Sequence, residues 1–381
     1  MVDNLINTSF PALLLFTVFA FSVFVQLIYL WLVFNKVGLK RNLILPDERR
    51  GNPEPVSVVI CAHNEFLHLR DNLPSILHQD YPEYEVLVVN HFSDDDTPYL
   101  LRKLQEQYPH LHVVTIEEEL NFFTGKKFPL SIGIKSARYD RILLTDADCR
   151  PVSDQWIRWM SSGFDQRKEI VLGYGRYRYN KGLLNALIRF DTLHIALQYL
   201  GFALAGRPYM GIGRNLAYSK GLFFRNNGFI SHYRIRSGDD DLFVNRVAVG
   251  SNTAVILHES SFTESEPKRT FGKWITQKRR HLSTATWYRP AHRFLLGFYV
   301  LTSILFYLTG ITLLSLVWSL FPVLALFMVR IASQFIVFYL SMRRLGERDL
   351  LPFLPVMELT LIVLNGSMAL ANLWKKPVKW R

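Results

Sequence analysis

The sequence is poor in cysteine and in charge, and both shortages narrow what the protein can be. It has two cysteines, Cys61 and Cys149, which excludes a disulfide-rich framework and suits unlinked thiols in a reducing compartment. Charged residues make up 20% of the 381 residues, below the roughly 25% of soluble proteins. Because hydrophobic residues reach 49% and the charge deficit lies at the two ends of the chain, a wholly soluble protein is excluded.

The N-terminal region lacks what a cleavable signal peptide needs. No Lys or Arg precedes its apolar run, the run is too long, and no small-residue cleavage site follows. Residues 10–34 carry no charge, and about 20 apolar residues suffice to span a bilayer. We therefore expect residues 1–40 to form a retained transmembrane anchor. By the positive-inside rule, the basic residues after it place the rest of the chain in the cytoplasm and the N-terminus outside: Lys36, Lys40, Arg41, Arg49 and Arg50.

A second apolar block, residues 294–329, is also free of charge and is too long for a single crossing. A break is expected near 319–321 and Pro322. We therefore predict one helix over about 294–318 and another over about 321–342. Three basic residues follow the second helix and place that loop inside: Arg343, Arg344 and Arg348.

The last apolar stretch, about 350–373, leaves two alternatives open. If it crosses the membrane, the C-terminal region 292–373 has three helices, and the basic tail 374–381 ends outside, against the positive-inside rule. Otherwise the region has two crossing helices, and the stretch is re-entrant or interfacial. Two charges lie inside these apolar segments, Arg330 and Glu358. They either pair inside the bundle or lie nearer an interface and snorkel.

Residues 54–286 have ordinary globular composition and alternate short apolar runs with helix-like spacing. Strands are predicted at 56–60, 85–89, 111–116 and 141–145, and helices at about 67–79, 97–107 and 128–137. This alternation is typical of βαβ units around a mostly parallel, buried sheet. Ligands bind beyond the carboxyl ends of such strands. Polar clusters occupy three of those places: residues 61–65, 90–96 and 145–148.

Two acidic motifs carry the expected chemistry. Asp146 and Asp148 end a buried strand, and carboxylates at i and i+2 suit a hard divalent cation completed by substrate phosphates. The alternative is a solvated turn or a helix cap. Asp239, Asp240 and Asp241 precede a helical run. One of the three is expected to cap that helix, and the surplus suggests a carboxylate kept for proton abstraction.

Two basic motifs are open to a functional and a structural interpretation. Lys126, in Gly125-Lys126-Lys127 ahead of a helix, either offsets phosphate charge or is part of a solvated helix start. On an amphipathic helix predicted over about 270–286, Gln277 and Arg280 share one face at i, i+3, and we assign them to a site. Two further cations of this helix are expected to touch anionic lipid: Lys278 and Arg279.

The order of these motifs, and their position between predicted transmembrane helices, resemble those of the family-2 glycosyltransferases. The likeness is closest to the membrane-bound branch with ceramide glucosyltransferase, hyaluronan synthase and cellulose synthase. It implies an α/β fold, a Rossmann-like GT-A domain that binds a nucleotide sugar, with flanking transmembrane helices. It further implies a metal held by Asp146 and Asp148, and a general base at Asp239 or, in the alternative register, Asp240. The nucleotide-sugar residues that it implies are Ala62, Asn64, Glu65, Asn90, Lys126 and Asp146.

Two departures from the family's motifs affect the interpretation. Gln277 and Arg280 match the catalytic Q-x-x-R-W motif, but His281 replaces the Trp that is associated with acceptor stacking in processive members. The family's D-D-x-S stretch is Asn90-His91-Phe92-Ser93 here, and Asn90 can still hydrogen-bond a base edge. The first departure, together with the few C-terminal helices, favours transfer of a single sugar.

The resemblance therefore predicts an integral-membrane, inverting hexosyltransferase of a bacterial inner membrane, with a cytoplasmic catalytic domain. The donor is expected to be a nucleotide-diphosphate sugar, UDP-linked, and the acceptor a hydroxyl of a lipid or lipid-linked molecule. The expected cofactor is Mg²⁺ or Mn²⁺. The alternatives are a processive polysaccharide synthase, an inactive relative that acts as a membrane scaffold, and a small transporter. Membrane lipids are expected partners, but nucleic acid is not, because the basic residues behind the charge of +12 cluster near membrane edges.

Overall fold

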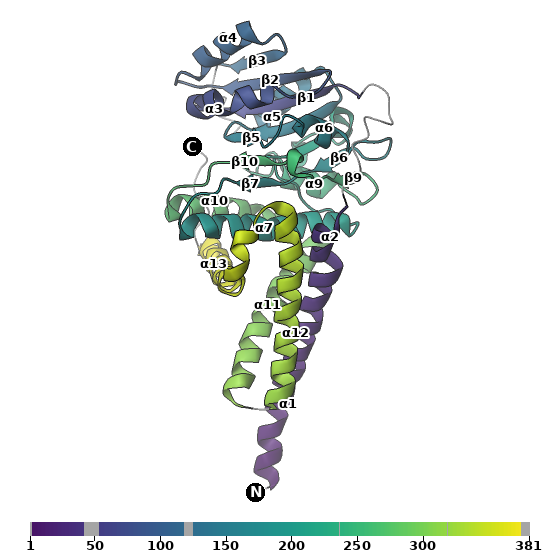
Figure 1. The fold of residues 1–381 in the computed structure, drawn as a ribbon, viewed down its shortest axis with the longest axis vertical. Coiled ribbons are helices and arrows are strands. Elements are labelled where there is room, and N and C mark those ends of the chain that lie inside the picture. Colours follow the sequence, from purple (N-terminus) through teal and green to yellow (C-terminus); the bar gives the residue numbers. More distant parts are fainter. Residues whose placement is uncertain (1, 42–52, 118–124, 236, 318, 375–381) are drawn as a thin grey trace.

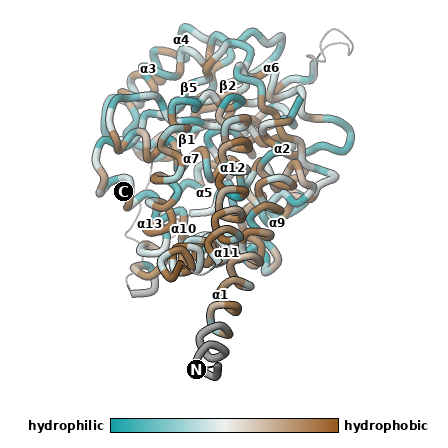
Figure 2. The backbone as a smooth tube through the Cα atoms, turned by 60° about the horizontal axis from the view of Figure 1, so that its bottom comes forward, coloured by the Kyte–Doolittle hydropathy of each residue, from teal (hydrophilic) through white to brown (hydrophobic). Residues whose placement is uncertain are grey.

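The computed structural model describes residues 2–41, 53–117, 125–235, 237–317 and 319–374. The predictions for Arg49, Arg50 and nearly all of the basic tail 374–381 fall outside these residues. Figure 1 shows an α/β domain at one end, a narrow bundle of long helices at the other, and helices lying crosswise between them. In Figure 2 the bundle is largely hydrophobic, whereas hydrophilic residues cover much of the α/β domain.

A seven-stranded sheet in the order β3-β2-β1-β4-β8-β6-β9 forms the centre of the α/β domain. The four predicted strands are confirmed and pair in parallel: β1 (Val56–Ala62), β2 (Tyr84–His91), β3 (Leu111–Ile116) and β4 (Arg141–Asp146). Three short strands that were not predicted complete the sheet: β6 (Ile170–Leu172), β8 (Leu216–Ser219) and β9 (Thr253–Val255). Since β8 is antiparallel to both β4 and β6, the parallel arrangement is confirmed for the half that carries the polar clusters.

Helices cover both faces of the sheet, because alternate residues of a strand point to opposite faces. Val58 and Ile60 of β1 pack with α3, α4 and α6, whereas Val59 packs on the other side with α5. At Gly133 of α5, a Cβ atom would lie 2.7 Å from Val59 Cγ1, so glycine permits this close approach. These helices, of which the first three were predicted, are α3 (Phe66–Leu77), α4 (Thr97–Gln107), α5 (Lys127–Ser136) and α6 (Trp156–Ser161).

A second, three-stranded sheet lies next to the first and begins directly after Asp148. Its strands, in the order β5-β10-β7, are β5 (Cys149–Pro151), β7 (Gly175–Tyr177) and β10 (Thr263–Ser265). The predicted amphipathic helix follows it as α10 (Phe271–Thr284), and the predicted helical run after the three aspartates is α9 (Asp241–Val247). Besides α6, two further helices were not predicted: α7 (Leu183–Leu204), which lies crosswise beneath the domain, and α8 (Lys220–Arg225).

Three long helices run together as the bundle below the domain. They are α1 (Val2–Ile28), which continues through a π-helical turn (Tyr29–Phe34) into α2 (Asn35–Leu39), together with α11 (Pro290–Ser315) and α12 (Leu320–Leu345). In the described residues, each of these segments is long and apolar enough to cross a membrane. The predicted break is confirmed between α11 and α12, where Val317 and Ser319 adopt positive φ angles of 52° and 45°.

The last apolar segment does not run with this bundle. A 3₁₀ segment (Arg348–Phe353) leads into α13 (Leu354–Trp374), which lies crosswise at the domain end of the bundle. There it packs against α10 and α7, and Arg279 of α10 donates a hydrogen bond from Nε to Asn372 Oδ1 at 2.8 Å. By length and composition alone this segment could also span a membrane. Its orientation favours the interfacial alternative over a further crossing.

Arg330 and Glu358 pair with each other inside the apolar region, which confirms one of the two predicted alternatives. Arg330 is fully buried, and its Nη2 and Nη1 atoms lie 2.6 and 3.0 Å from the two carboxylate oxygens of Glu358. Gln334 and Gln26 accept further hydrogen bonds from the same guanidinium at 2.6 and 3.3 Å. The network therefore joins α1, α12 and α13 where no water would satisfy these groups.

Candidate active site

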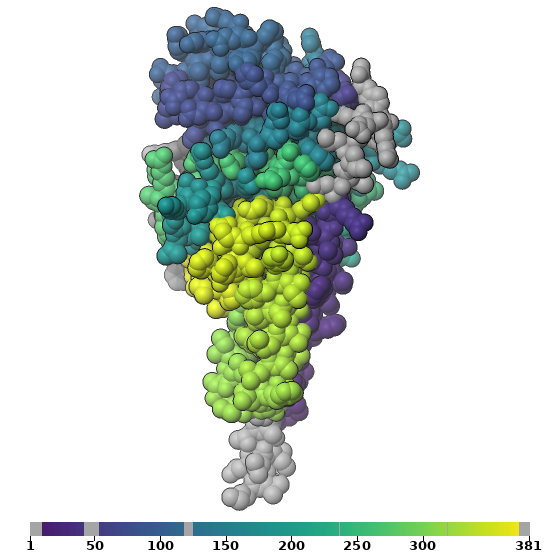
Figure 3. All heavy atoms as spheres, in the orientation of Figure 1, coloured from purple at the N-terminus to yellow at the C-terminus, as the bar shows by residue number. Residues whose placement is uncertain are grey.

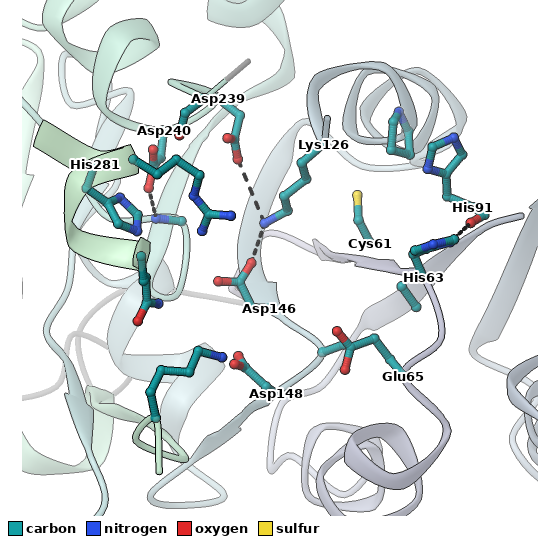
Figure 4. A pocket seen from close by; sticks show the side chains of 18 of the residues that line it. Cys61, His63, Glu65, His91, Lys126, Asp146, Asp148, Asp239, Asp240 and His281 are labelled. Carbon is teal, nitrogen blue, oxygen red and sulfur yellow. Dashed lines mark hydrogen bonds and ion pairs between the residues drawn. The ribbon is translucent and has the colours of Figure 1, made fainter. Parts of the chain in front are cut away.

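The polar clusters at the strand ends meet in one open pocket of about 620 Å³ between the sheet and α10. The end of β1 with the residues after it, together with the last residue of β2, forms one wall (Figure 4). The end of β4 forms the floor, and α10 with the segment before α9 forms the opposite wall. Most of the predicted site residues line this pocket: Ala62, Glu65, Lys126, Asp146, Asp148, Asp239, Asp240, Gln277 and Arg280. The fold therefore brings together residues from five separate parts of the chain.

Asp146 and Asp148 project into the pocket from the carboxyl end of β4. Their carboxylate oxygens and the thiol of Cys149 lie within 4.8 Å of one another. Burial would raise the pKa of Asp146, but the ion pair with Lys126 outweighs it and lowers the pKa. Burial and the charge of Asp146 both raise the pKa of Asp148. Asp148 thus carries the less compensated charge of the pair.

The donor atoms at this place fit a hard divalent cation. Two adjacent carboxylates that open onto a pocket are typical Mg²⁺ or Mn²⁺ ligands, with substrate phosphates and water completing the coordination. Cys149 is not expected to be a ligand, because its thiol is fully buried, burial raises its pKa well above the usual value, and Sγ contacts Ser265 Oγ at 2.9 Å. Asp146 and Asp148 are therefore the residues that would hold the ion.

The three consecutive aspartates have three different environments. Asp240 caps α9, since its carboxylate accepts hydrogen bonds at 2.7 Å from the N–H groups of Asp241 and Gly213. Asp241 is buried and accepts hydrogen bonds from the hydroxyls of Thr284 and Tyr288. Asp239 faces the pocket, with its Oδ2 3.9 Å from Lys126 Nζ. Burial and the charge of Asp240 raise the pKa of Asp239.

A single buried lysine holds the loop that leads to these aspartates. Lys127, at the start of α5, is 3% exposed and donates hydrogen bonds from Nζ to three backbone carbonyls. The acceptors are His232, Ile235 and Ser237, at 2.9, 2.5 and 2.7 Å. Asp239 follows Ser237 by two residues, so this contact fixes the backbone from which Asp239 projects. The neighbouring Lys126, which the family resemblance singled out, points into the pocket instead.

One face of α10 forms a wall of the pocket, while its other face packs inside the protein. Gln277 and Arg280 line the pocket together with His281, and Gln277 Nε2 donates to Tyr177 Oη at 3.3 Å. The prediction that Lys278 touches lipid is wrong, whereas Arg279 is partly exposed, so lipid contact there stays a prediction. Lys278 is buried and forms an ion pair with Asp191 of α7, and Arg279 bonds to α13. Both cations bind to residues of helices that the sequence did not place beside α10, namely α7 and α13.

Two predicted nucleotide-sugar residues do not line the pocket. Asn64 has a positive φ of 55° and ties the segments after β1 and β2 together: its N–H donates to Ser93 Oγ, and its Oδ1 accepts from the N–H of Asp94. Asn90 is 1% exposed, and its Oδ1 is buried without a partner among the described residues. His91, the next residue of β2, lines the pocket in its place. A shift of one residue in a strand moves the side chain to the opposite face.

Among the residues that line the pocket, the predicted site omitted four basic ones besides His281: His63, His91, Lys268 and Lys273. His63 lies inside the polar cluster 61–65 and donates from Nδ1 to the carbonyl of His91 at 2.7 Å, since a carbonyl oxygen can only accept. Lys268 and Lys273 precede or begin α10, and no local pattern separates them from solvated lysines. Their place at the pocket depends on how α10 folds back across it.

Comparisons with known proteins find similar sequences among glycosyltransferases. The poly-beta-1,6-N-acetyl-D-glucosamine synthase of Staphylococcus epidermidis is 26% identical over 147 residues, 38% of this chain and 34% of that protein. The probable glycosyltransferase YdaM of Bacillus subtilis (strain 168) is 24% identical over 251 residues, 63% of this chain and 57% of that protein. The chain thus matches about a third to somewhat over half of the length of these relatives.

The solved structure of the mannosyltransferase PcManGT from Pyrobaculum calidifontis, in complex with GDP-Man and Mn²⁺, has the same fold. It matches with a TM-score of 0.59 at 19% identity and covers 96% of this chain and 99% of that one. The predicted GT-A fold with apolar helices is thereby confirmed. The sequence model of the family described as "Glycosyl transferase family 21" matches residues 14–381, nearly the whole chain. This protein therefore belongs to glycosyl transferase family 21.

Proposed function

We propose that the protein is a membrane-embedded, inverting glycosyltransferase that moves one sugar from a nucleotide-diphosphate sugar to a hydroxyl of a lipid or lipid-linked acceptor. The observation that carries this proposal is the position of Asp239 across the pocket from Asp146 and Asp148 (Figure 4). One wall thus offers a proton acceptor, and the floor offers ligands for a cation beside a diphosphate. Both are needed for direct displacement at an anomeric carbon.

Asp239 is the proposed general base. It would take the proton of the acceptor hydroxyl while the hydroxyl oxygen attacks the anomeric carbon and the bond to the diphosphate breaks on the opposite side, which inverts the configuration. The raised pKa of Asp239 increases its affinity for that proton. Asp240 is a poorer candidate, because both of its oxygens already accept backbone hydrogen bonds at the start of α9.

The diphosphate is expected to lie over Asp146 and Asp148, next to Arg280. A Mg²⁺ or Mn²⁺ ion held there would supply positive charge that stabilises the departing diphosphate. Among the described residues, Arg280 Nε is buried without a hydrogen-bond partner, so a phosphate oxygen would satisfy this donor. Gln277 is positioned one turn away on the same face of α10 and would complete the wall. These contacts favour the state in which negative charge has moved to the leaving group.

The donor and acceptor follow from the sequence and from the surroundings of the pocket. We keep a UDP-linked sugar as the first choice, and the GDP-Man held by PcManGT makes a GDP-linked sugar the alternative. A lipid acceptor is supported by α10, which lines the pocket and packs against α13 at the end of the apolar bundle. The pocket would then face the cytoplasmic side of a bacterial inner membrane. The synthase name of the staphylococcal relatives supports processive synthesis as the alternative.

Turnover of a panel of nucleotide sugars by the purified full chain tests this proposal, with release of free nucleotide diphosphate as the measurement. Asp239→Asn should lower kcat by about 10²- to 10⁴-fold while donor binding persists, because general-base catalysis contributes roughly that much. Asp240→Asn is the matched variant and should act mainly through stability. If Asp240→Asn alone abolishes turnover, the base assignment is wrong. If no nucleotide sugar is turned over with Mg²⁺ or Mn²⁺, the scaffold alternative is favoured.

A further inference from the structure

Two cations at the domain end of the bundle lack the counter-charge that Lys278 has. Lys40 follows the last residue of α2, and Arg344 lies in the last turn of α12. In the described part of the chain, neither has a carboxylate oxygen within 4.0 Å, whereas Lys278 pairs with Asp191. Both are partly exposed. Lys278, where lipid contact was expected from the sequence, is neutralised by Asp191, whereas Lys40 and Arg344 keep their charge without an ion-pair partner among the described residues.

The ends of α2 and α12 lie in direct contact, so the two cations share one site. A Cβ atom at Gly38 would lie 2.7 Å from Leu340 Cβ and 3.1 Å from the backbone nitrogen of Ser341. In Figure 3 the end of α12, in yellow, borders the end of α2, in purple, below the α/β domain. Burial lowers the pKa of Lys40, and the charges of Arg344 and Lys168 lower it further, as expected for neighbouring cations.

The guanidinium of Arg344 also has unused hydrogen-bonding capacity. Its Nε and Nη2 atoms are buried without a hydrogen-bond partner among the described residues, and so is the hydroxyl oxygen of Ser341, one turn earlier on α12. Buried donors without acceptors cost free energy, so an acceptor that reaches them is favoured. Lys168 adds a third charge, although its Nζ already donates to the carbonyls of Gly250 and Thr253 at 2.7 and 2.9 Å.

We propose that Lys40 and Arg344, where α2 meets α12, form a binding site for the phosphate of an anionic phospholipid headgroup. The two helices are continuous with segments apolar enough to span a membrane, so this contact lies where a lipid headgroup would be found. Basic pockets between membrane helices on the cytoplasmic side bind such headgroups, and a guanidinium suits a phosphate through its paired N–H groups. The proposal is independent of the reaction in the pocket.

Lipid-dependent stability of the full chain tests the site. The protein is purified into nanodiscs of phosphatidylcholine with an increasing fraction of phosphatidylglycerol, and Tm is measured in each. The test variant is Lys40→Gln with Arg344→Gln. The control is Lys36→Gln with Arg343→Gln, which removes the same charge from exposed residues of the same two helices. A further arm adds inorganic phosphate to nanodiscs of phosphatidylcholine alone.

The wild type and the control pair should gain Tm as phosphatidylglycerol increases. The test pair should need roughly 10- to 30-fold more of that lipid for the same gain, since it loses the hydrogen bonds from both cations to the phosphate, at about fivefold in affinity for each cation. Equal weakening in both pairs would show diffuse attraction of a positive surface and would overturn the proposal. No difference between the test pair and the wild type would overturn it too. An equal rise in Tm with inorganic phosphate alone would assign the site to a free anion instead.

Discussion

Replacing Lys127 with methionine should impair catalysis, although Lys127 does not line the pocket where the substrate is expected to bind. The ammonium donates three hydrogen bonds to the carbonyls of His232, Ile235 and Ser237, in the loop that carries Asp239. Bonds to a charged group contribute about 1.5–3 kcal/mol each, but the freed carbonyls regain water when the loop opens, so we expect a net loss of roughly 2–4 kcal/mol in the stability of this loop. That would depopulate the arrangement in which Asp239 faces the pocket.

The assay combines turnover with donor binding. For Lys127→Met, kcat should fall by roughly 10- to 100-fold, whereas the Kd of the donor should stay within about threefold, because the residues expected to bind the diphosphate are elsewhere. Amide hydrogen exchange over residues 230–238 should quicken. Lys135→Met is the control, as Lys135 is an exposed lysine of the same helix. Unchanged kcat in Lys127→Met, or an equal loss in the control, would refute the positioning role.

Three further predictions concern charge. Lys278→Met should lower the free energy of unfolding by about 3–5 kcal/mol, since it strands the buried Asp191 carboxylate, and Lys278→Met with Asp191→Leu should recover most of the Tm. Arg330→Leu should likewise destabilise the protein in nanodiscs, and Arg330→Leu with Glu358→Leu should restore much of the Tm. Burial, and then the charge of Lys127, lower the pKa of His232 to about 4 from 6.5. The uncharged form is therefore favoured in the folded protein. The contribution of His232 to the free energy of unfolding is fully present above about pH 6.5 and is lost as the pH falls toward 4. His232→Phe should therefore make Tm less dependent on pH in this range.

Local patterns in the sequence were enough for the parts of the fold that depend on local physics. Alternating apolar runs predicted β1 to β4 and the helices between them, and uninterrupted apolar stretches predicted the bundle helices. Since ligands of parallel sheets bind at the carboxyl ends of the strands, the same patterns placed Asp146 and Asp148 at the pocket. The short antiparallel strands and α7 were missed. Strands of three or four residues carry too little periodicity to be recognised.

Only the tertiary structure decided what each side chain does within these elements. Three identical residues, Asp239 to Asp241, became a pocket carboxylate, a helix cap and a buried acceptor, because Gly213 and Thr284 approach two of them from distant segments. Lys278 looked like a lipid contact until α7 brought Asp191 to it from 87 residues away. The sequence determines charge, length and periodicity, which act locally. Which charges are neutralised and which remain free depends on contacts between distant segments, and those exist only once the chain has folded.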